Sequence, residues 1–204
     1  MAFLRPSLSV DPDADIRGAG VYLRAPGMQD YAAWAELRAL SRQHLSPWEP
    51  QWARDELTRS SFRRRLRAAQ RETRDDLGYS YLIFAETPLR LVGGLNVSNV
   101  RRGIAQTASI GYWIGSPYAG RGLMTDAVRA VALFAFANLR LHRLEAACLP
   151  TNAASMRVLE KTGFRLEGQA RQYLKIDGRW QDHSLYALLQ SDLQSDQRPG
   201  PARS

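Results

Sequence analysis

The sequence of 204 residues contains one cysteine, Cys148, and only two lysines, Lys161 and Lys175. A single cysteine excludes an intrachain disulfide and a zinc site built from cysteines. No run of about 18 apolar residues occurs, and this excludes a membrane-spanning helix. Residues 1–6 are interrupted too soon, by an arginine and a proline, to form the apolar core of a secretory signal. These absences predict a cytoplasmic protein.

The composition is that of a globular protein, with 45% hydrophobic and 24% charged residues. The length allows one domain or at most two small ones. No repeat or linker separates residue 21 from residue 189, so we predict one domain over 21–189. Residues 1–20 lack any hydrophobic period and predict a flexible leader, and the polar residues 190–204 predict a flexible tail.

The net charge of +8 favours an acidic partner. Nearly all the basic residues are arginines in a chain rich in alanine, as a GC-rich coding bias also produces. Seven of them fall in a predicted helix over residues 59–74. Such a helix ordinarily presents a solvated face, and its functional alternative is a contact with ribosomal RNA.

Hydrophobic periodicity predicts a mixed α/β fold with the element order β-α-α-β-β-β-α-β-α-β-β. A helix over 122–139 is apolar almost all round, so it should be buried on more than one side. The dipeptide Asp177-Gly178 predicts a type I′ hairpin turn between the last two strands. We expect strands at 21–24, 79–86, 91–99, 107–114 and 144–149, and a further extended segment at 164–167 before the hairpin. Helices are expected over 59–74, 122–139 and 152–162, and another helix is expected to begin at residue 30. A loop is expected at 44–50.

Residues 111–125 (GYWIGSPYAGRGLMT) read as a strand, a glycine-containing loop and a helix that begins near Gly122. The first N–H groups of a helix lack internal partners and carry the positive end of its dipole, so they suit a pyrophosphate. Gly120 and Gly122 would let phosphates approach the backbone, and Arg121 adds a cation. The same glycines also suit an ordinary turn, and the spacing matches neither a Rossmann nor a Walker loop.

A second segment, residues 150–164, reads as a short helix with both ends marked. Asn152 is a good N-cap, and Gly163 suits the left-handed position after the helix, where Phe164 can fold back on Leu159. This structural role accounts for every residue of the segment. A functional role would place Asn152 and Ser155 between the start of the helix and the preceding strand.

Together these segments resemble the GNAT superfamily of acetyl-CoA-dependent N-acetyltransferases, over residues 21–189. The nearer branch is the Rim type, the ribosomal-protein-alanine N-acetyltransferases. The residues that carry this resemblance are Gly120-Arg-Gly-Leu-Met-Thr125, His142-Arg143, Asn152-x-x-Ser155, Gly163-Phe164, Glu167-Gly168, the run 173–183 (YLKIDGRWQDH) and the run 46–50 (SPWEP).

The resemblance implies a GNAT-like acyl-CoA N-acyltransferase fold, acetyl-CoA as the acetyl donor and no metal. The family's phosphate loop, Q/R-x-x-G-x-G/A, falls on residues 119–124, where Ala119 and Met124 depart from the pattern but the backbone donors remain. The strand ending at residues 113–114 would pair with the pantetheine arm, which Asn152 would also bind. The implied cofactor-binding residues are Trp113, Ile114, Ala119, Gly120, Arg121, Gly122, Leu123, Met124, Thr125, Asn152 and Ser155.

The implied reaction is direct transfer, with a neutral amine attacking the thioester and Ser155 as the acid for the departing thiolate. An α-amine has a pKa of about 7.7–8.0 and needs only a weak base, whereas a lysine amine has a pKa near 10.4. Glu49 is the candidate base, ahead of Asp182 and Glu167, although each carboxylate also fits a surface or turn role. The implied substrate-binding residues are Trp48, Glu49, Tyr173 and Asp182.

Three functions remain open at this point. The first is an acetyl-CoA-dependent N-acetyltransferase for the N-terminal α-amine of a protein, such as a ribosomal protein that begins with Ala or Ser. The second is an N-acetyltransferase for a small amine, such as a drug, a polyamine or an amino acid. The third is a basic ribosome- or RNA-binding protein with a vestigial cofactor site, against which the complete loop over 120–125 counts. The three histidines show no metal-ligand spacing.

Overall fold

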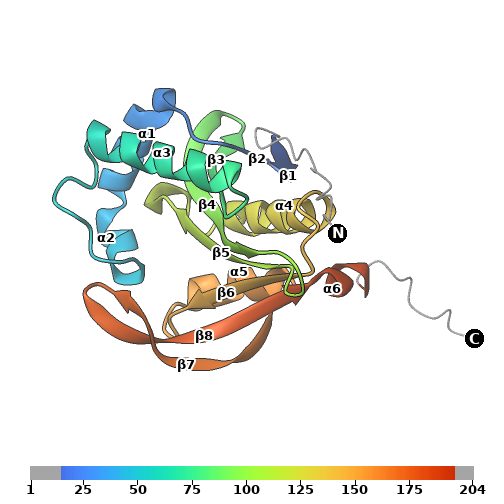
Figure 1. The fold of residues 1–204 in the computed structure, drawn as a ribbon. Helices are drawn as coiled ribbons and strands as arrows, with labels where there is room; N and C mark the ends of the chain where they lie inside the picture. The colour runs from blue at the N-terminus through green and yellow to red at the C-terminus, as the bar shows by residue number, and fades with distance from the viewer. Residues whose placement is uncertain (1–14, 196–204) are drawn as a thin grey trace, which may run out of the picture.

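The computed structural model describes residues 15–195 as one eight-stranded sheet, in the order β1-β2-β3-β4-β5-β6-β8-β7 (Figure 1). Neighbouring strands are antiparallel except β5 and β6, which are parallel. The strands are β1 (Ile16–Gly18), β2 (Val21–Arg24), β3 (Tyr79–Glu86), β4 (Leu89–Arg101), β5 (Thr107–Ile114), β6 (Arg143–Cys148), β7 (Arg165–Ile176) and β8 (Arg179–Leu189).

Helices cover both faces of this sheet (Figure 1). One face carries the helices of the first half of the chain, and the other carries two helices from the second half. The α-helices are α1 (Tyr31–Leu40), α2 (Arg42–Leu45), α3 (Arg59–Arg74), α4 (Leu123–Ala137), α5 (Ala153–Lys161) and α6 (Gln190–Ser195), and the 3-10 turns are η1 (Met28–Asp30), η2 (Ser46–Trp48) and η3 (Ser116–Tyr118).

Two hydrophobic clusters hold these layers together. The larger one packs α4 and α5 on the sheet, with Val128, Val131 and Leu144 wholly buried. The smaller one packs α1 and α3 on the opposite face, through residues such as Trp34 and Phe62. Most of α4 is buried, as its apolar circumference predicted. The aliphatic and aromatic side chains of the two clusters supply the apolar burial that stabilises the sheet.

The sheet is interrupted between β5 and β6. The two strands pair only where residues 107–109 face residues 143–145. Beyond this point β5 follows β4 as far as Ile114, while β6 follows β8 as far as Cys148. The strands therefore diverge and leave a gap in the sheet, at the end of β5 from which the loop to α4 leaves.

The predicted mixed α/β class is confirmed, and so is the type I′ turn, because Asp177 and Gly178 both have positive φ, 45° and 76°. The boundaries predicted for the leader and the tail differ from those in the structure. Ile16 is buried in the core, and β1 pairs with β2, so residues 16–18 belong to the sheet. Residues 190–195 form α6. The rest of the predicted leader and tail, residues 1–14 and 196–204, lies outside the described residues.

The segment 44–50 was predicted to be a loop, but in the structure it contains the end of α2 and the turn η2. The proline of η2 is in its first turn, where a missing N–H costs nothing. None of the helices within residues 15–195 has the length and apolar character needed to span a membrane.

Candidate active site

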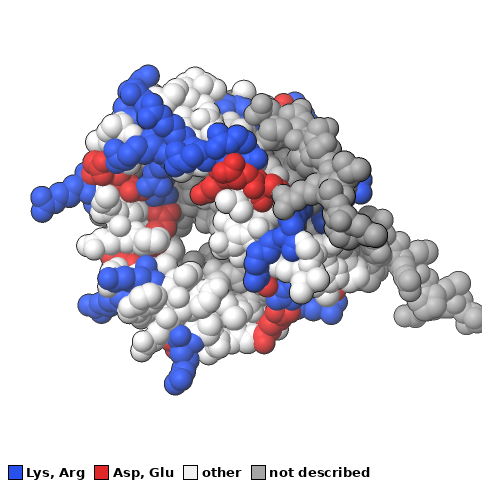
Figure 2. Space-filling view, viewed as in Figure 1, with Lys and Arg blue, Asp and Glu red and all other residues white. Residues whose placement is uncertain are grey.

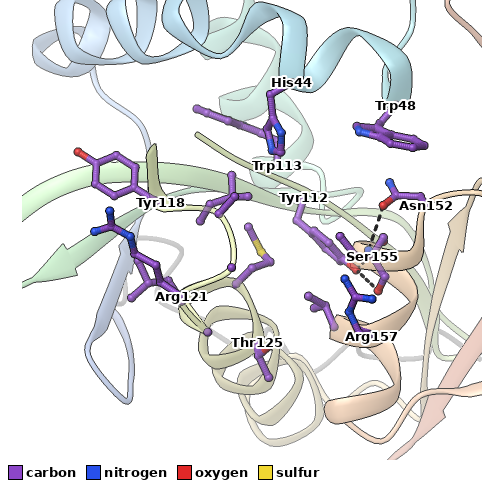
Figure 3. A pocket seen from close by; sticks show the side chains of 18 of the residues that line it. His44, Trp48, Tyr112, Trp113, Tyr118, Arg121, Thr125, Asn152, Ser155 and Arg157 are labelled. Carbon is purple, nitrogen blue, oxygen red and sulfur yellow. Dashed lines mark hydrogen bonds between the residues drawn. The ribbon is translucent and has the colours of Figure 1, made fainter. Parts of the chain in front are cut away.

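A cavity of about 400 Å³ lies where β5 ends, α4 begins and α5 begins. We call it the loop cavity. Figure 3 shows Tyr118 and Arg121 on one side of it and Asn152, Ser155 and Arg157 on the other. All the residues predicted to bind the cofactor line this cavity, namely Trp113, Ile114, Ala119, Gly120, Arg121, Gly122, Leu123, Met124, Thr125, Asn152 and Ser155.

Two glycines shape the side of the loop cavity that carries the predicted phosphate loop. Gly120 and Gly122 have φ of 75° and 83°, a left-handed conformation that glycine adopts without a steric penalty. Gly122 is the N-cap of α4, so the N–H groups of the next residues have no acceptor within the helix. A Cβ at either glycine would meet nothing within 4 Å. The loop therefore presents open backbone donors to the cavity.

The loop cavity also gathers positive charge. Arg121, Arg157 and Lys161 line it, and among residues 15–195 Glu49 is the only acidic residue that does. Arg121 lies over the ring of Tyr118, at 5.7 Å from the ring centroid. Arg157 and Lys161 were not predicted, although a signal was present, because they stand four residues apart on the helix that Asn152 caps. This electrostatic setting suits a ligand with several phosphate groups.

Ser155 lies at the edge of the loop cavity and is held there by hydrogen bonds with two residues, Asn152 and Tyr112. Its backbone N–H donates to Oδ1 of Asn152 at 3.0 Å, the capping bond that the sequence predicted. Its Oγ lies 2.9 Å from the hydroxyl of Tyr112. Burial raises the pKa of Tyr112 well above its usual value. The Tyr112 hydroxyl therefore stays protonated at neutral pH. It lies within hydrogen-bonding distance of both the Oγ and the backbone carbonyl oxygen of Ser155, and in the Oγ pair either hydroxyl can be the donor.

Glu49 lines the loop cavity, but its carboxylate is already occupied. Arg38, only 6% exposed, donates to both oxygens at 2.7 and 2.8 Å, and the indole N–H of Trp52 donates at 2.8 Å. The Arg38 guanidinium also lies over the rings of Trp52 and Trp113, at 4.4 and 5.0 Å. This geometry supports a positioning role for Glu49, between α1 and β5, rather than its predicted role as a base.

The other predicted carboxylates and Tyr173 lie away from Ser155. Asp182 accepts the backbone N–H of Gln172 at 2.8 Å within the β7–β8 hairpin. Glu167 pairs with Arg143 at 2.7 Å, and this guanidinium holds the pKa of Glu167 below its usual range. Tyr173 is 48% exposed. None of these three lines the cavities that contain Ser155, whereas Trp48 does.

Two more cavities adjoin the loop cavity. The gap cavity, about 420 Å³, lies between β5 and β6 beneath the β7–β8 hairpin, and Trp48, Ser155 and His183 are among its lining residues. The helix cavity, about 590 Å³, lies between α1, α3 and the strands β3 to β5. Tyr112 lines all three cavities. The site can therefore receive two ligands from different directions that meet at Tyr112.

The cysteine and the possible metal ligands can also be located relative to this site. Cys148 is buried, as predicted, and burial raises the pKa of its thiol, so it is a poor nucleophile. Among residues 15–195 no group of three His, Cys, Asp or Glu side chains is placed to hold a metal ion.

The model of the acetyltransferase (GNAT) domain family matches residues 21–165. The chain belongs to this family. This match confirms the GNAT resemblance, and the relatives and solved structures that follow confirm its Rim-type branch. The chain is 34% identical to the [Ribosomal protein uS5]-alanine N-acetyltransferase of Escherichia coli (strain K12), over 81% of this chain and 86% of that one. It is 38% identical to the protein named "Probable N-acetyltransferase YjcK" of Bacillus subtilis (strain 168), over 87% of this chain and 98% of that one.

Solved structures give the same GNAT assignment. The structure of Mycobacterium smegmatis RimJ in complex with CoA-disulfide superposes with a TM-score of 0.82 at 34% identity, covering 88% of each chain. The ribosomal-protein-S5-alanine acetyltransferase of Vibrio fischeri superposes with a TM-score of 0.80 at 29% identity, over 92% of this chain and all of that one. The fold of this GNAT protein is therefore that of the Rim-type enzymes.

The phosphate-loop assignment can be tested at Gly122. We expect Gly122→Trp to abolish binding of acetyl-CoA, because the indole would fill the space in front of the backbone donors. Cofactor at about 100 times its Kd should stabilise the wild type by about 2.7 kcal/mol, measured by thermal unfolding, and should leave the variant unchanged. Gly103→Trp is the control, since Gly103 has a similar φ of 67° and equally open surroundings in the β4–β5 turn. Normal stabilisation of Gly122→Trp would refute the assignment.

Proposed function

We propose that this protein transfers the acetyl group of acetyl-CoA to the N-terminal α-amine of a protein, with a ribosomal protein that begins with Ala or Ser as the acceptor. The observation that carries the proposal is the junction of three cavities at Tyr112, beside Ser155. A donor in the loop cavity and an acceptor in the gap cavity would meet there. Relatives named as ribosomal-protein N-acetyltransferases support the acceptor class.

The loop cavity fits acetyl-CoA by the chemistry of its donors. The backbone N–H groups at the start of α4, with Arg121, would hold the pyrophosphate, and Arg157 and Lys161 would hold the remaining phosphate. The edge of β5 at residues 113–114 has no partner in β6, so it is free to pair with the amide groups of the pantetheine arm. When bound, acetyl-CoA supplies an activated thioester.

The chain's own residues would then control protons at this thioester. In this transfer Tyr112, whose hydroxyl lies 2.9 Å from Ser155 Oγ, would donate to that oxygen, and Ser155 would donate to the departing sulfur. Asn152 fixes the start of α5 and with it the direction of Ser155. The α-amine of a protein has a pKa of about 7.7–8.0, so a sizeable fraction reaches the site without a proton. Direct transfer therefore requires no covalent enzyme intermediate.

Mass spectrometry after incubation with acetyl-CoA and a panel of acceptors tests this function. The panel holds peptides with free Ala, Ser or Met N-termini, N-blocked peptides with an internal lysine, and several small amines. We expect the mass of one acetyl group only on peptides with a free Ala or Ser N-terminus. Transfer to a small amine alone would replace the proposed acceptor by the second hypothesis. Cofactor binding without transfer to any free N-terminus would also contradict the proposal.

The role of Ser155 can be separated from its place at the start of α5. We expect Ser155→Ala to lower kcat about 100-fold, the typical contribution of a positioned acid, with little change in the Kd of acetyl-CoA. Tyr112→Phe should produce a smaller loss, because Ser155 then loses one donor but keeps its own proton. Stopped-flow or steady-state kinetics with calorimetric binding would measure both values. If Ser155→Ala keeps the wild-type kcat, Ser155 does not act as an acid and only contributes to the start of the helix.

The contact with ribosomal RNA predicted for residues 59–74 stays a prediction. Figure 2 shows Lys and Arg side chains gathered over the part of the surface that α3 occupies in Figure 1. Arg64 and Arg65 have acidic partners in the loop before α3. Arg63, Arg67 and Arg71 are exposed, stand at successive four-residue steps, and form no ion pair within residues 15–195. Such a row costs helix stability through like-charge repulsion and suits a polyanion.

Salt dependence tests this prediction. We expect the triple variant Arg63→Gln, Arg67→Gln and Arg71→Gln to bind a labelled oligouridylate more weakly. The slope of log affinity against log salt concentration should be shallower by about 2 than that of the wild type. Each of the three lost phosphate contacts should contribute about 0.7 to this difference. The control triple Arg90→Gln, Arg140→Gln and Arg179→Gln removes the same charge elsewhere. Equal losses in both triples, or no binding by the wild type, would contradict the prediction.

A further inference from the structure

The gap cavity holds a histidine that neither the sequence analysis nor the proposed function has used. His183 lies on β8, is 2% exposed, and lines the gap cavity together with Tyr112 and Ser155. In the part of the chain that the structure describes, no Asp or Glu lines this cavity. Among the residues that line it, His183 is the one side chain with a ring nitrogen that can accept a proton.

The hydrogen bond of the His183 ring fixes which nitrogen carries the proton. Nδ1 lies 3.0 Å from the backbone carbonyl oxygen of Gln181. A carbonyl oxygen can only accept, so the Nδ1 atom must donate its proton to it. In the neutral ring this leaves Nε2 with a free lone pair. Within residues 15–195, the ring makes no side-chain hydrogen bond other than the one from Nδ1.

The neighbours of the ring keep it in this orientation. The ring of Tyr173 packs edge-on against His183, with centroids 5.8 Å apart. The next residue, Ser184, pairs with Cys148 of β6 in the ladder that forms one wall of the gap. A buried imidazole held by a backbone carbonyl and an aromatic ring is oriented in the same way as the general bases of many enzymes.

We infer that His183 is the general base of the acetyl transfer, and this inference rests on the proposed function. His183 Nε2 accepts the proton that the acceptor nitrogen loses as the N–C bond forms and the C–S bond breaks. Ser155 donates one proton to the departing sulfur, with Tyr112 as its donor. One proton is removed and one is delivered, so the reaction needs no further reagent, and the proton on His183 returns to the hydroxyl pair through water.

The placement of the two groups supports this division of roles. Ser155 lines both the loop cavity and the gap cavity, whereas His183 lines only the gap cavity. The acid therefore stands where the donor's sulfur would lie, and the base stands on the acceptor's side. Glu49, the base predicted from the sequence, lines the loop cavity and the helix cavity with both oxygens bonded to Arg38.

Two variants distinguish a base from a buried structural histidine. His183→Asn keeps an N–H near the position of Nδ1 for the carbonyl of Gln181 but has no counterpart of Nε2. We expect it to fold with an unchanged thermal midpoint and an unchanged Kd for acetyl-CoA, and to lose about 100-fold in kcat. His183→Ala leaves room for a free imidazole, so added imidazole should restore part of its kcat and should not help His183→Asn.

The outcomes are decisive in either direction. A wild-type kcat for His183→Asn would overturn the inference, because the bond to Gln181 would then be the whole role of the ring. A loss in both variants without imidazole rescue of His183→Ala would overturn it too. Failure of the proposed function has a different signature: the wild-type protein itself would not acetylate a free N-terminus. If the wild type acetylates only a small amine, the same variants test His183 with that amine.

Discussion

The site depends on one constraint, the early end of the pairing between β5 and β6. A parallel pair inside a sheet normally continues, since each unpaired backbone group away from water costs free energy. Here the ladder stops after Ser109 and Glu145, and each strand continues with its other neighbour. The unpaired edge of β5 remains available to a ligand, and the gap connects the two faces of the sheet. The three cavities that meet at Tyr112 follow from this divergence.

A buried charge cluster around Arg38 connects β5, on one side of the gap, to α1. Arg38 is nearly inaccessible to water, and a charge in that position is expensive unless it is paired and hydrogen-bonded. The two bonds to Glu49 and the faces of Trp52 and Trp113 supply that pairing. These contacts join α1, the segment after η2 and β5 into one unit. Trp48, the residue before Glu49, lines both the loop cavity and the gap cavity.

Sequence reasoning found the parts of the site that local patterns specify. The glycines of the phosphate loop and the cap at Asn152 are set by backbone conformation a few residues away, so their spacing was enough. The pairing of Glu49 with Arg38 could not be foreseen, because Arg38 is 11 residues away on another element and no local pattern reveals that pair. The sequence did not indicate a role for His183 either. The role inferred for it depends on the hydrogen bond from Nδ1 to the Gln181 carbonyl and on the cavity beside the ring, and neither can be recognised from a local pattern. The short strand β1 escaped detection because three residues are too few for a period.

The proton equilibrium of the acceptor explains how such a site can select α-amines without a strong base. At pH 7.4 roughly 30% of an α-amine with a pKa near 7.8 is neutral, against roughly 0.1% of a lysine amine near 10.4. A site without a free carboxylate beside the reacting atoms cannot offset that difference. Of the described residues, Glu49 is the only acidic one that lines either cavity containing Ser155, and its carboxylate is bonded to Arg38. A neutral imidazole that accepts one proton during the transfer is then sufficient for an α-amine. Under the proposed function, lysine side chains would react far more slowly at this site, because so small a fraction of them is neutral.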